Sequence, residues 1–295
     1  MGWLHYLMGS EEGAQAVTYP KEGEDAVLHY KTTQKEFPVP YVLYVDFESF
    51  LVPSADKGSV SEHVPSGFCC LKVSKFDDEL FEPYVYSGPD VMTKFYEHVY
   101  REQEIIYTKL NIQKDMSPMT DREKSEYENA STCPNCNNPF DKISRVKVKH
   151  HCHTTGRFLG AVCAKCNLQL KYRKRKRPDN GSDEFFIPVI AHNMKNYDSH
   201  LIIKGYERSV SQQSDITVIP CNTEKFMAFQ IGKLRFLDSF QFMAASLDNL
   251  VKTLPADAFN FTSKFSPAPH LAKQKGVYPY EFMTCLLYTS PSPRD

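Results

Sequence analysis

Short apolar runs separated by polar turns predict that strands begin the folded part of the chain. The run Tyr41–Asp46 follows two prolines and predicts a buried strand. Phe68–Val73 and Pro83–Tyr86 predict two further strands. From Asp90 to Leu110 apolar residues recur at helical spacing, which predicts a helix with one apolar face.

The same alternation returns in the second half of the chain. Phe185–Ala191 predicts another buried strand, which leads into a helix that begins near Tyr197. Ser246 has the position of a residue that caps a later helix. Between these helices three strands are predicted, at Ile216–Pro220, Phe226–Ile231 and Leu234–Asp238. Strands with helices set between them predict an α/β fold built on a mixed sheet.

A polar segment that contains cysteines interrupts this pattern. Thr120–Glu123 has the sequence of a capping box, so it predicts a short charged helix that ends before Cys133. Each of two Cys-x-x-Cys pairs can place two thiolates about one ion, which predicts a tetrahedral structural zinc site. The four residues are Cys133, Cys136, Cys163 and Cys166. The alternative is two disulfides or separate buried cysteines, but free thiols fit a reducing, intracellular compartment better.

A net charge of −1 conceals a strongly basic segment. Twelve lysines and arginines lie between Lys142 and Arg177 with no acidic residue, so the rest of the chain carries −13. Four thiolates and one zinc ion would leave about +10 here, which predicts a polyanionic partner, and DNA first. The densest run offers Lys171, Arg173 and Arg175 as phosphate contacts, or else it is a solvated helix end or linker.

Carboxylates after two of the predicted strands indicate a second metal site. Asp46 and Glu48 lie two residues apart at the end of the first strand, so both can reach one ion. Asp198 enters the first turn of the helix near Tyr197. Three such carboxylates can hold two Mg²⁺ or Mn²⁺ ions about 4 Å apart, as two-metal hydrolysis of a phosphodiester requires. The alternatives are a polar strand end and a carboxylate that only caps its helix.

These carboxylate motifs resemble the exonuclease motifs of family B DNA polymerases. Val45–Ser49 is similar to the first motif and Asn193–Asp198 to the second. Phe236–Leu250 is similar to a later segment of the protein-primed branch, found in Polinton/Maverick-type transposable elements and related viruses. The resemblance covers about residues 39–283. It implies an RNase H-like (DnaQ-like) fold and a 3′→5′ proofreading exonuclease.

The resemblance also implies roles for individual residues. Asp46, Glu48 and Asp198 would bind the catalytic metals. Asn193 and Tyr197 would hold a single-stranded DNA 3′ end, since a tyrosine ring offers a surface for base stacking. Further partners would be primer–template DNA and a terminal protein primer. No Tyr-x₃-Asp motif and no polymerase palm follows, and residues 284–295 resemble translated adapter read-through, so we expect a truncated product.

The basic segment resembles the recombination endonuclease VII type of His-Me finger nuclease, through Lys149–Arg157 and Cys163–Asn167. The resemblance implies a ββα module with the four cysteines on zinc, His151 as general base and Asn167 as a ligand of a catalytic metal. Where that family has an aspartate this chain has His150, and imidazole is a poorer Mg²⁺ ligand than carboxylate. We therefore expect a DNA-contacting insertion rather than an active nuclease. Alternatively, a nearby histidine replaces one cysteine at the zinc.

The sequence thus predicts an exonuclease domain interrupted by a zinc module. The expected parts are an N-terminal segment 1–37, the exonuclease domain 38–130 and 179–283, the module 131–178 and a foreign tail 284–295. Competing hypotheses are a non-catalytic DNA-binding zinc module on an inactive scaffold, and a metal-dependent endonuclease. No apolar run approaches the roughly 20 residues of a membrane span. We expect the protein inside the cell, in the nucleus or at a viral replication site.

Overall fold

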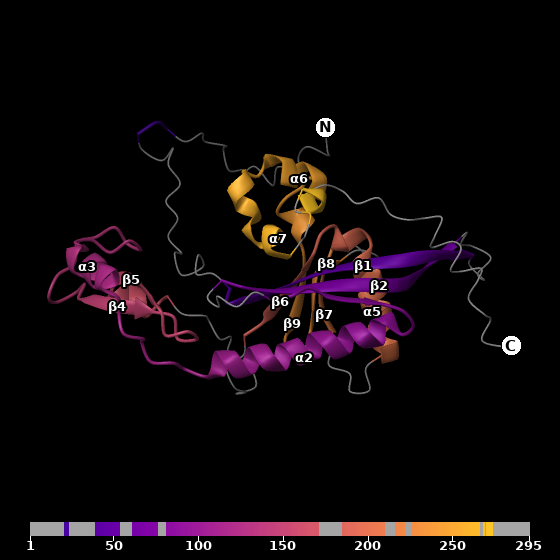
Figure 1. The fold of residues 1–295 in the computed structure, drawn as a ribbon, viewed down its shortest axis with the longest axis horizontal. Helices are drawn as coiled ribbons and strands as arrows, with labels where there is room; N and C mark the ends of the chain where they lie inside the picture. The colour runs from indigo at the N-terminus through magenta and orange to yellow at the C-terminus, as the bar shows by residue number, and fades with distance from the viewer. Residues whose placement is uncertain are drawn as a thin grey trace, which may run out of the picture. The chain divides into compact units, whose positions relative to one another are not determined.

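The computed structural model describes residues 21–23, 39–53, 61–75, 81–170, 185–209, 216–221, 226–265, 268 and 270–273 (Figure 1). The chain divides into two compact units, Met1–Phe37 and Pro38–Asp295. In the first unit the described residues form a turn, in which Gly23 has φ +83°. The predicted basic run 171–177, the linker after it and the tail 284–295 lie outside the described residues.

Seven strands form the main sheet of the second unit. They are β1 (Tyr41–Pro53), β2 (Ser61–Ser74), β3 (Tyr84–Ser87), β6 (Ile187–Ala191), β7 (Ile216–Pro220), β8 (Phe226–Ile231) and β9 (Leu234–Asp238). Their order across the sheet is β3-β2-β1-β6-β9-β8-β7. β1, β6 and β9 run parallel to one another, whereas the other neighbouring pairs are antiparallel. The predicted mixed α/β sheet is therefore confirmed.

The strand order reverses between β1 and β6. From β1 the chain runs outward through β2 and β3, and it then returns to the other side of β1, where β6 and β9 lie. β1 and β6 are paired at Leu43–Val189 and Tyr44–Ile190. Residues of β1 after Tyr44 therefore lie beyond the last paired position. Open α/β sheets bind ligands outside the carboxyl ends of their strands at such a reversal.

β1 is longer than the predicted strand Tyr41–Asp46. Its antiparallel pairing with β2 continues to Pro53 through a β-bulge between Glu48 and Ser49. This part of the strand depends on backbone pairing rather than on an apolar pattern, which explains why the sequence did not reveal it. Alternate side chains of β1 enter the core, namely Tyr41, Leu43, Val45 and Phe47.

Two helices, α2 (Val91–Asn111) and α5 (Asp198–Ser209), contribute to the same core and contact each other. Tyr96 of α2 donates a hydrogen bond to the backbone oxygen of Ile202 (2.6 Å). The helices lie so close that a Cβ on Gly205 would come within 2.7 Å of Met92 Cγ. The predicted helix Asp90–Leu110 is confirmed, and its buried apolar residues are Val91, Phe95, Tyr96, Val99, Ile106 and Tyr107.

The cysteine-containing segment forms a separate hairpin with two small helices (Figure 1). β4 (Lys147–His151) and β5 (Phe158–Cys163) pair antiparallel, and α4 (Ala164–Asn167) follows, which gives a ββα order. α3 (Asp121–Asn129) begins with the predicted capping box, because Thr120 and Glu123 satisfy each other's backbone N–H groups. Tyr127 of α3 donates to the backbone oxygen of Lys147 (3.1 Å). α3 is therefore attached to the hairpin, although it precedes the predicted start of the module at residue 131.

The other described elements are short. They are η2 (Met194–Asn196), η3 (Ser239–Gln241), α6 (Leu247–Thr253), η4 (Ala256–Phe259), α7 (Asn260–Phe265) and η5 (Leu271–Lys273). The predicted cap of α6 is confirmed, since Ser246 Oγ accepts a hydrogen bond from Asn249 N–H (3.3 Å). Among the described residues no helix is long and apolar enough to cross a membrane.

Candidate metal centres

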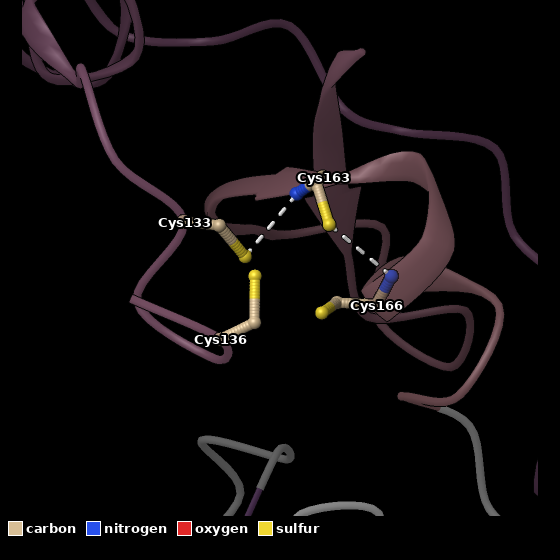
Figure 2. A group of neighbouring side chains, drawn as sticks. All are labelled: Cys133, Cys136, Cys163 and Cys166. Atoms are coloured by element: carbon tan, nitrogen blue, oxygen red, sulfur yellow. Dashed lines mark hydrogen bonds between the residues drawn. The ribbon is translucent and has the colours of Figure 1, made fainter. Parts of the chain in front are cut away.

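Four cysteines converge in the hairpin segment, as the spacing predicted (Figure 2). Their sulfur atoms all lie within 4.8 Å of one another. Tetrahedral zinc–thiolate bonds of about 2.3 Å place sulfur atoms about 3.8 Å apart, so this cluster needs only a small contraction about an ion. Within the described ranges no histidine belongs to the group, which favours the four-cysteine set over the alternative with a histidine ligand. The same residues form no disulfide.

The first cysteine pair lies on a tight turn. Cys133 accepts a backbone hydrogen bond from Asn137 (2.8 Å) and donates one to Asn138 (2.9 Å). Asn137 has φ +52°, a left-handed conformation that asparagine tolerates better than most residues. The turn brings Cys136 back beside Cys133, which is fully buried.

The second cysteine pair lies where β5 passes into α4. Cys163 ends β5, and its sulfur accepts the N–H of Cys166 (3.4 Å). The two pairs are joined as well, because the N–H of Cys163 points to Cys133 Sγ (3.3 Å). Backbone N–H groups directed at sulfur stabilise thiolates, which are the form that binds metal.

Without a cation, the four closely spaced thiols of the cysteine cluster cannot all be thiolates. Burial and the neighbouring sulfurs raise the pKa of Cys166. Burial opposes ionisation of Cys136 too, but hydrogen bonds from Asn138 and the other cysteines lower its pKa to about 6. The pKa values of neighbouring thiols thus shift in opposite directions, because like charges at this distance disfavour each other. The cluster fits a divalent cation, which would permit all four to ionise.

His150 and Asn167, predicted to lie at a catalytic metal, are in direct contact. His150 Nδ1 donates to Asn167 Oδ1 (2.8 Å), and the His150 ring is buried. Burial lowers the pKa of His150, and the nearby rings of His151 and His153 add to this effect. A β-bulge separates His150 from His151, so the two rings do not follow a regular strand pattern. The predicted general base, His151, lies against His153 with ring centroids 4.7 Å apart.

The basic residues of the hairpin segment differ in whether they form hydrogen bonds within the segment or are exposed to solvent. Lys147 is engaged within the segment, since its Nζ donates to the backbone oxygens of Tyr127 (2.8 Å), Glu128 (3.1 Å) and Ala130 (3.0 Å) at the end of α3. Four other basic side chains are exposed to solvent, namely Lys142, Lys149, Arg157 and Lys165. The predicted phosphate contacts Lys171, Arg173 and Arg175 lie outside the described residues.

A second group of charged residues lies at the reversal of strand order in the main sheet. Asp46 and Glu48 are on the outward face of β1, so the predicted common face is observed. Desolvation by the surrounding protein raises the pKa of Asp46, although its side chain still contacts solvent. Desolvation and the charge of Asp46 raise the pKa of Glu48. Both carboxylates therefore bind protons more tightly than usual.

Asp198 is the most constrained of the predicted carboxylates. It lies in the first turn of α5 and is 2% exposed. Burial, together with the charge of Asp46 and a smaller contribution from Asp238, raises its pKa to about 7. Its Oδ1 atom is buried and has no hydrogen-bond partner in the structure. A buried carboxylate oxygen without a partner beside another carboxylate fits a cation site.

The ligand atoms of Asp46, Glu48 and Asp198 lie farther apart than the four cysteine sulfur atoms do. Among the described residues, no three His, Cys, Asp or Glu ligand atoms other than the cysteine sulfurs lie mutually within 4.8 Å. Residues that fit a metal are therefore present at this edge, but the structure does not bring Asp46, Glu48 and Asp198 within common coordination distance. Their roles stay predictions.

The two predicted DNA-holding residues lie in the loop after β6. Asn193 has φ +64°, and its Oδ1 accepts a hydrogen bond from Asn196 Nδ2 (2.6 Å). The Tyr197 hydroxyl is hydrogen-bonded to Ser49, just after the bulge in β1. The Tyr197 ring lies edge-on to His63 of β2, with centroids 5.2 Å apart. The Tyr197 side chain thus attaches the loop after β6 to β1, close in the chain to Asp198.

Asp238 is a further buried carboxylate at this edge, which the sequence analysis did not select. It ends β9, the strand parallel to and beside β6, and is 2% exposed. A carboxylate at the end of a third parallel strand was the signal that could have revealed it, because parallel strands bring their carboxyl ends to one edge.

The hairpin segment is similar to a known protein family. Residues 108–178 match the family described as Recombination endonuclease VII. The chaperone protein DnaJ of Halalkalibacterium halodurans is 36% identical over an alignment of 56 residues, and this alignment covers 16% of this chain and 15% of the chaperone. The chain therefore spans a small part of that relative. No solved structure matches. Residues 108–178 thus form an endonuclease VII-like domain that includes α3, the hairpin and the four cysteines.

Proposed function

We propose that the chain acts on DNA, and that its endonuclease VII-like domain is a zinc-stabilised DNA-binding module. The observation that carries this proposal is the convergence of four cysteine sulfurs within 4.8 Å inside the segment that matches this family. Zinc held by two knuckles fixes a small hairpin that buries few apolar side chains of its own. The fixed hairpin then presents its basic residues to phosphates.

DNA contact is assigned to the exposed basic side chains of the module. Lys149 and Arg157 lie on or beside the hairpin strands and are exposed. Lys147 is excluded because its ammonium group is engaged by three backbone oxygens of α3. Contacts of this kind give affinity that depends strongly on salt and little on sequence.

Binding rather than cleavage is the role that we favour for the module. In the endonuclease VII resemblance Asn167 is a metal ligand, but here its Oδ1 accepts a hydrogen bond from His150. An imidazole stands where that resemblance expects a carboxylate, which weakens the preference for Mg²⁺. His151 as a general base for hydrolysis is the alternative. Nicking of branched DNA that is lost in His151→Ala would favour that alternative.

We propose a second function for the α/β domain, a two-metal 3′→5′ exonuclease on an RNase H-like fold. The buried, unpartnered Oδ1 of Asp198 beside Asp46, at the reversal of strand order, favours it. Asp46, Glu48 and Asp198 would hold Mg²⁺ or Mn²⁺ there. A bound divalent ion would supply Lewis-acid polarisation of the phosphodiester and an acidified water. Asn193 and Tyr197 would position the single-stranded 3′ end next to these carboxylates.

The parent of such a domain would be a protein-primed family B DNA polymerase of a mobile element or virus. Its partners would then include primer–template DNA and a terminal protein, and it would act inside the cell, in the nucleus or at a viral replication site. Sequencing of the source transcript beyond the codon for Met283 tests this proposal. A Tyr-x₃-Asp motif followed by palm carboxylates is expected, and an early genuine stop codon would contradict it.

The DNA-binding proposal is tested by fluorescence anisotropy with the zinc-loaded chain and labelled DNA. The Lys149→Met and Arg157→Met variants should each weaken binding and reduce the salt slope by about 1. Lys124→Met is the matched control, because Lys124 is an exposed lysine of α3 that pairs with Asp121 (2.9 Å). Equal affinities for all four proteins would contradict the assignment.

The exonuclease proposal is tested through metal binding and digestion together. Asp46→Asn and Asp198→Asn should weaken Mn²⁺ binding to the zinc-loaded chain. We expect weak or no digestion of 5′-labelled single-stranded DNA by the chain itself, because the third exonuclease motif is missing from this sequence. Strong Mg²⁺-dependent 3′→5′ digestion that Asp46→Ala abolishes would show that this expectation is wrong. Unchanged Mn²⁺ binding in both variants would contradict the site.

A further inference from the structure

The loops that follow β6 and β9 hold each other through one side chain from each. His192, after β6, is hydrogen-bonded through Nδ1 to Ser239 Oγ (3.0 Å) and donates from Nε2 to the backbone oxygen of Ala245 (3.0 Å). In the opposite direction, Asp238 of β9 accepts from the backbone N–H of Lys195 (3.0 Å). Each loop is therefore fixed by the end of the neighbouring strand.

The bond from Asp238 reaches the turn that carries Asp198. Lys195 lies in η2, where Tyr197 N–H donates to the backbone oxygen of Met194 (3.2 Å). α5 begins at the next residue, Asp198. Because the turn is short and hydrogen-bonded, fixing Lys195 also fixes the direction in which the Asp198 side chain leaves the backbone.

Asp238 cannot easily serve as a ligand itself. Its second oxygen accepts the backbone N–H of Phe240 (2.9 Å), so both oxygens are engaged, and the side chain is buried. Its negative charge nevertheless acts on Asp198 and adds to the field of Asp46. A buried carboxylate in this position has two effects: it orients a neighbouring ligand and makes the site more attractive to a cation.

We propose that Asp238 is a positioning residue of a divalent-cation site formed by Asp46, Glu48 and Asp198. It fixes the loop that carries Asp198 and adds negative charge beside it. This inference rests on the second proposed function, since that function supplies the cation. The resemblance to the exonuclease motifs assigns no role to Asp238.

The test compares Asp238→Asn with the wild-type chain after saturation with zinc. Asparagine keeps the size of the side chain, but it loses the charge and can accept at only one terminal atom. Free Mn²⁺ measured by electron paramagnetic resonance should show binding weakened about 10- to 100-fold. Asp248→Asn is the matched control, because Asp248 lies on α6 and pairs with Lys252 (2.6 Å). This control should bind Mn²⁺ as the wild-type chain does.

The possible results separate this inference from the exonuclease proposal. If Asp46→Asn loses Mn²⁺ but Asp238→Asn keeps the wild-type affinity, the role of Asp238 is refuted and the site stands. If the wild-type chain binds no Mn²⁺ beyond the level of Asp46→Asn, the site and the role of Asp238 both fail.

A measurement on the wild-type chain covers the case in which Asp238→Asn does not fold. Mn²⁺ should slow hydrogen exchange of the Lys195 and Phe240 amides together, because Asp238 accepts a hydrogen bond from each of them. Slowed exchange of the Lys195 amide alone would overturn the inference.

Discussion

The cysteine cluster and the carboxylate edge are both candidate metal sites, but they are built in opposite ways. The cysteines come from two tight turns, and their backbone N–H groups point directly at sulfur. Asp46 and Glu48 lie on β1, whereas Asp198 begins α5 after the loop that follows β6. The order of the strands and the hydrogen bonds of that loop therefore determine where the carboxylates lie. The first site is complete within residues 133–166. The second draws on residues as far apart in the chain as Asp46 and Asp198.

A sequence can therefore specify the first kind of site locally, but not the second. Two residues between cysteines fix a turn whatever the rest of the chain does. A carboxylate at a strand end gains its neighbours only when strands far apart in sequence pair in the correct order. The tight cluster of sulfurs and the looser carboxylates follow from this contrast. If the contrast holds, the two sites are independent, and damage to one leaves the other intact.

Removal of one cysteine should have the largest effect. Cys163→Ser should abolish zinc binding, since structural zinc contributes on the order of 10 kcal/mol to small modules of this kind. We expect protease cleavage within residues 121–170 and loss of DNA binding, with the main sheet still folded. Cys221→Ser, an exposed cysteine outside the cluster, is the control. Unfolding of the main sheet in Cys163→Ser would show that the two regions depend on each other.

Neutralisation of Asp198 should stabilise the metal-free protein at high pH. In the folded protein the Asp198 carboxyl keeps its proton up to a pKa of about 7, against an ordinary value of 3.8. The stability that comes from this proton is present at low pH and is lost as pH rises through about 7. Asp198→Asn should therefore match the wild-type chain near pH 4 and exceed it at pH 8, by at most about 4 kcal/mol.

Thermal unfolding at several pH values measures this difference. Mn²⁺ should reverse it at pH 8, because the ion stabilises the wild-type carboxylates and not the variant. Asp248→Asn serves as the control, with an expected change below about 0.5 kcal/mol at every pH. A constant difference between Asp198→Asn and wild type from pH 4 to pH 8 would contradict the assigned pKa.

Gly156→Ala should weaken the zinc module alone. Gly156 has φ +80°, and a Cβ there would lie 2.6 Å from the backbone oxygen of Asp115. Strain of this kind costs about 1 to 3 kcal/mol. Gly160→Ala is the matched control, because Gly160 also has a positive φ but no atom within 4 Å of an added Cβ. Chemical denaturation should show the larger loss for Gly156→Ala, and equal losses would exclude the close contact as a cause.

Lys147 and Lys149 should separate stability from DNA binding. Lys147→Met removes an ammonium group that binds three backbone oxygens at the end of α3, so it should cost about 1.5 kcal/mol of stability. Lys149→Met should cost less stability, about 0.5 kcal/mol, because its ammonium group lies 5.5 Å from the centroid of the Tyr127 ring. It should reduce DNA affinity and its salt dependence. Thermal unfolding and anisotropy on both variants measure the two effects. A larger loss of stability in Lys149→Met together with a larger loss of DNA affinity in Lys147→Met would contradict this assignment.

Much of the fold follows from the sequence, because its elements carry clear local patterns. The capping box at Thr120 and the cap at Ser246 are both present. The extension of β1 to Pro53 was missed, since backbone pairing with β2 rather than side-chain pattern maintains it. The structural role of Lys147 was missed too, because a count of charges cannot show which lysine faces the end of a helix.

The two candidate metal sites also differ in how much of each could be predicted from the sequence. The four cysteines were predictable from spacing alone, and the structure brings them together. The position of Asp198 at the start of α5 was also predictable. The influence of the Asp238 charge on Asp198 was not, because it depends on β9 lying next to β6. Chain order does not give the order of strands across a sheet.

The attachment of the zinc module to the main sheet has a consequence for how such a chain could be assembled. Tyr107, near the end of α2, donates to the backbone oxygen of Phe185 (2.5 Å), and their rings stack 4.2 Å apart. The points where the chain leaves and re-enters the α/β domain are therefore neighbours. Foreign sequence is accepted most readily where a host fold already holds its two cut ends together. The whole cassette could thus be gained, exchanged or lost in one step, and a short loop from Asn111 to Phe185 would restore an uninterrupted domain.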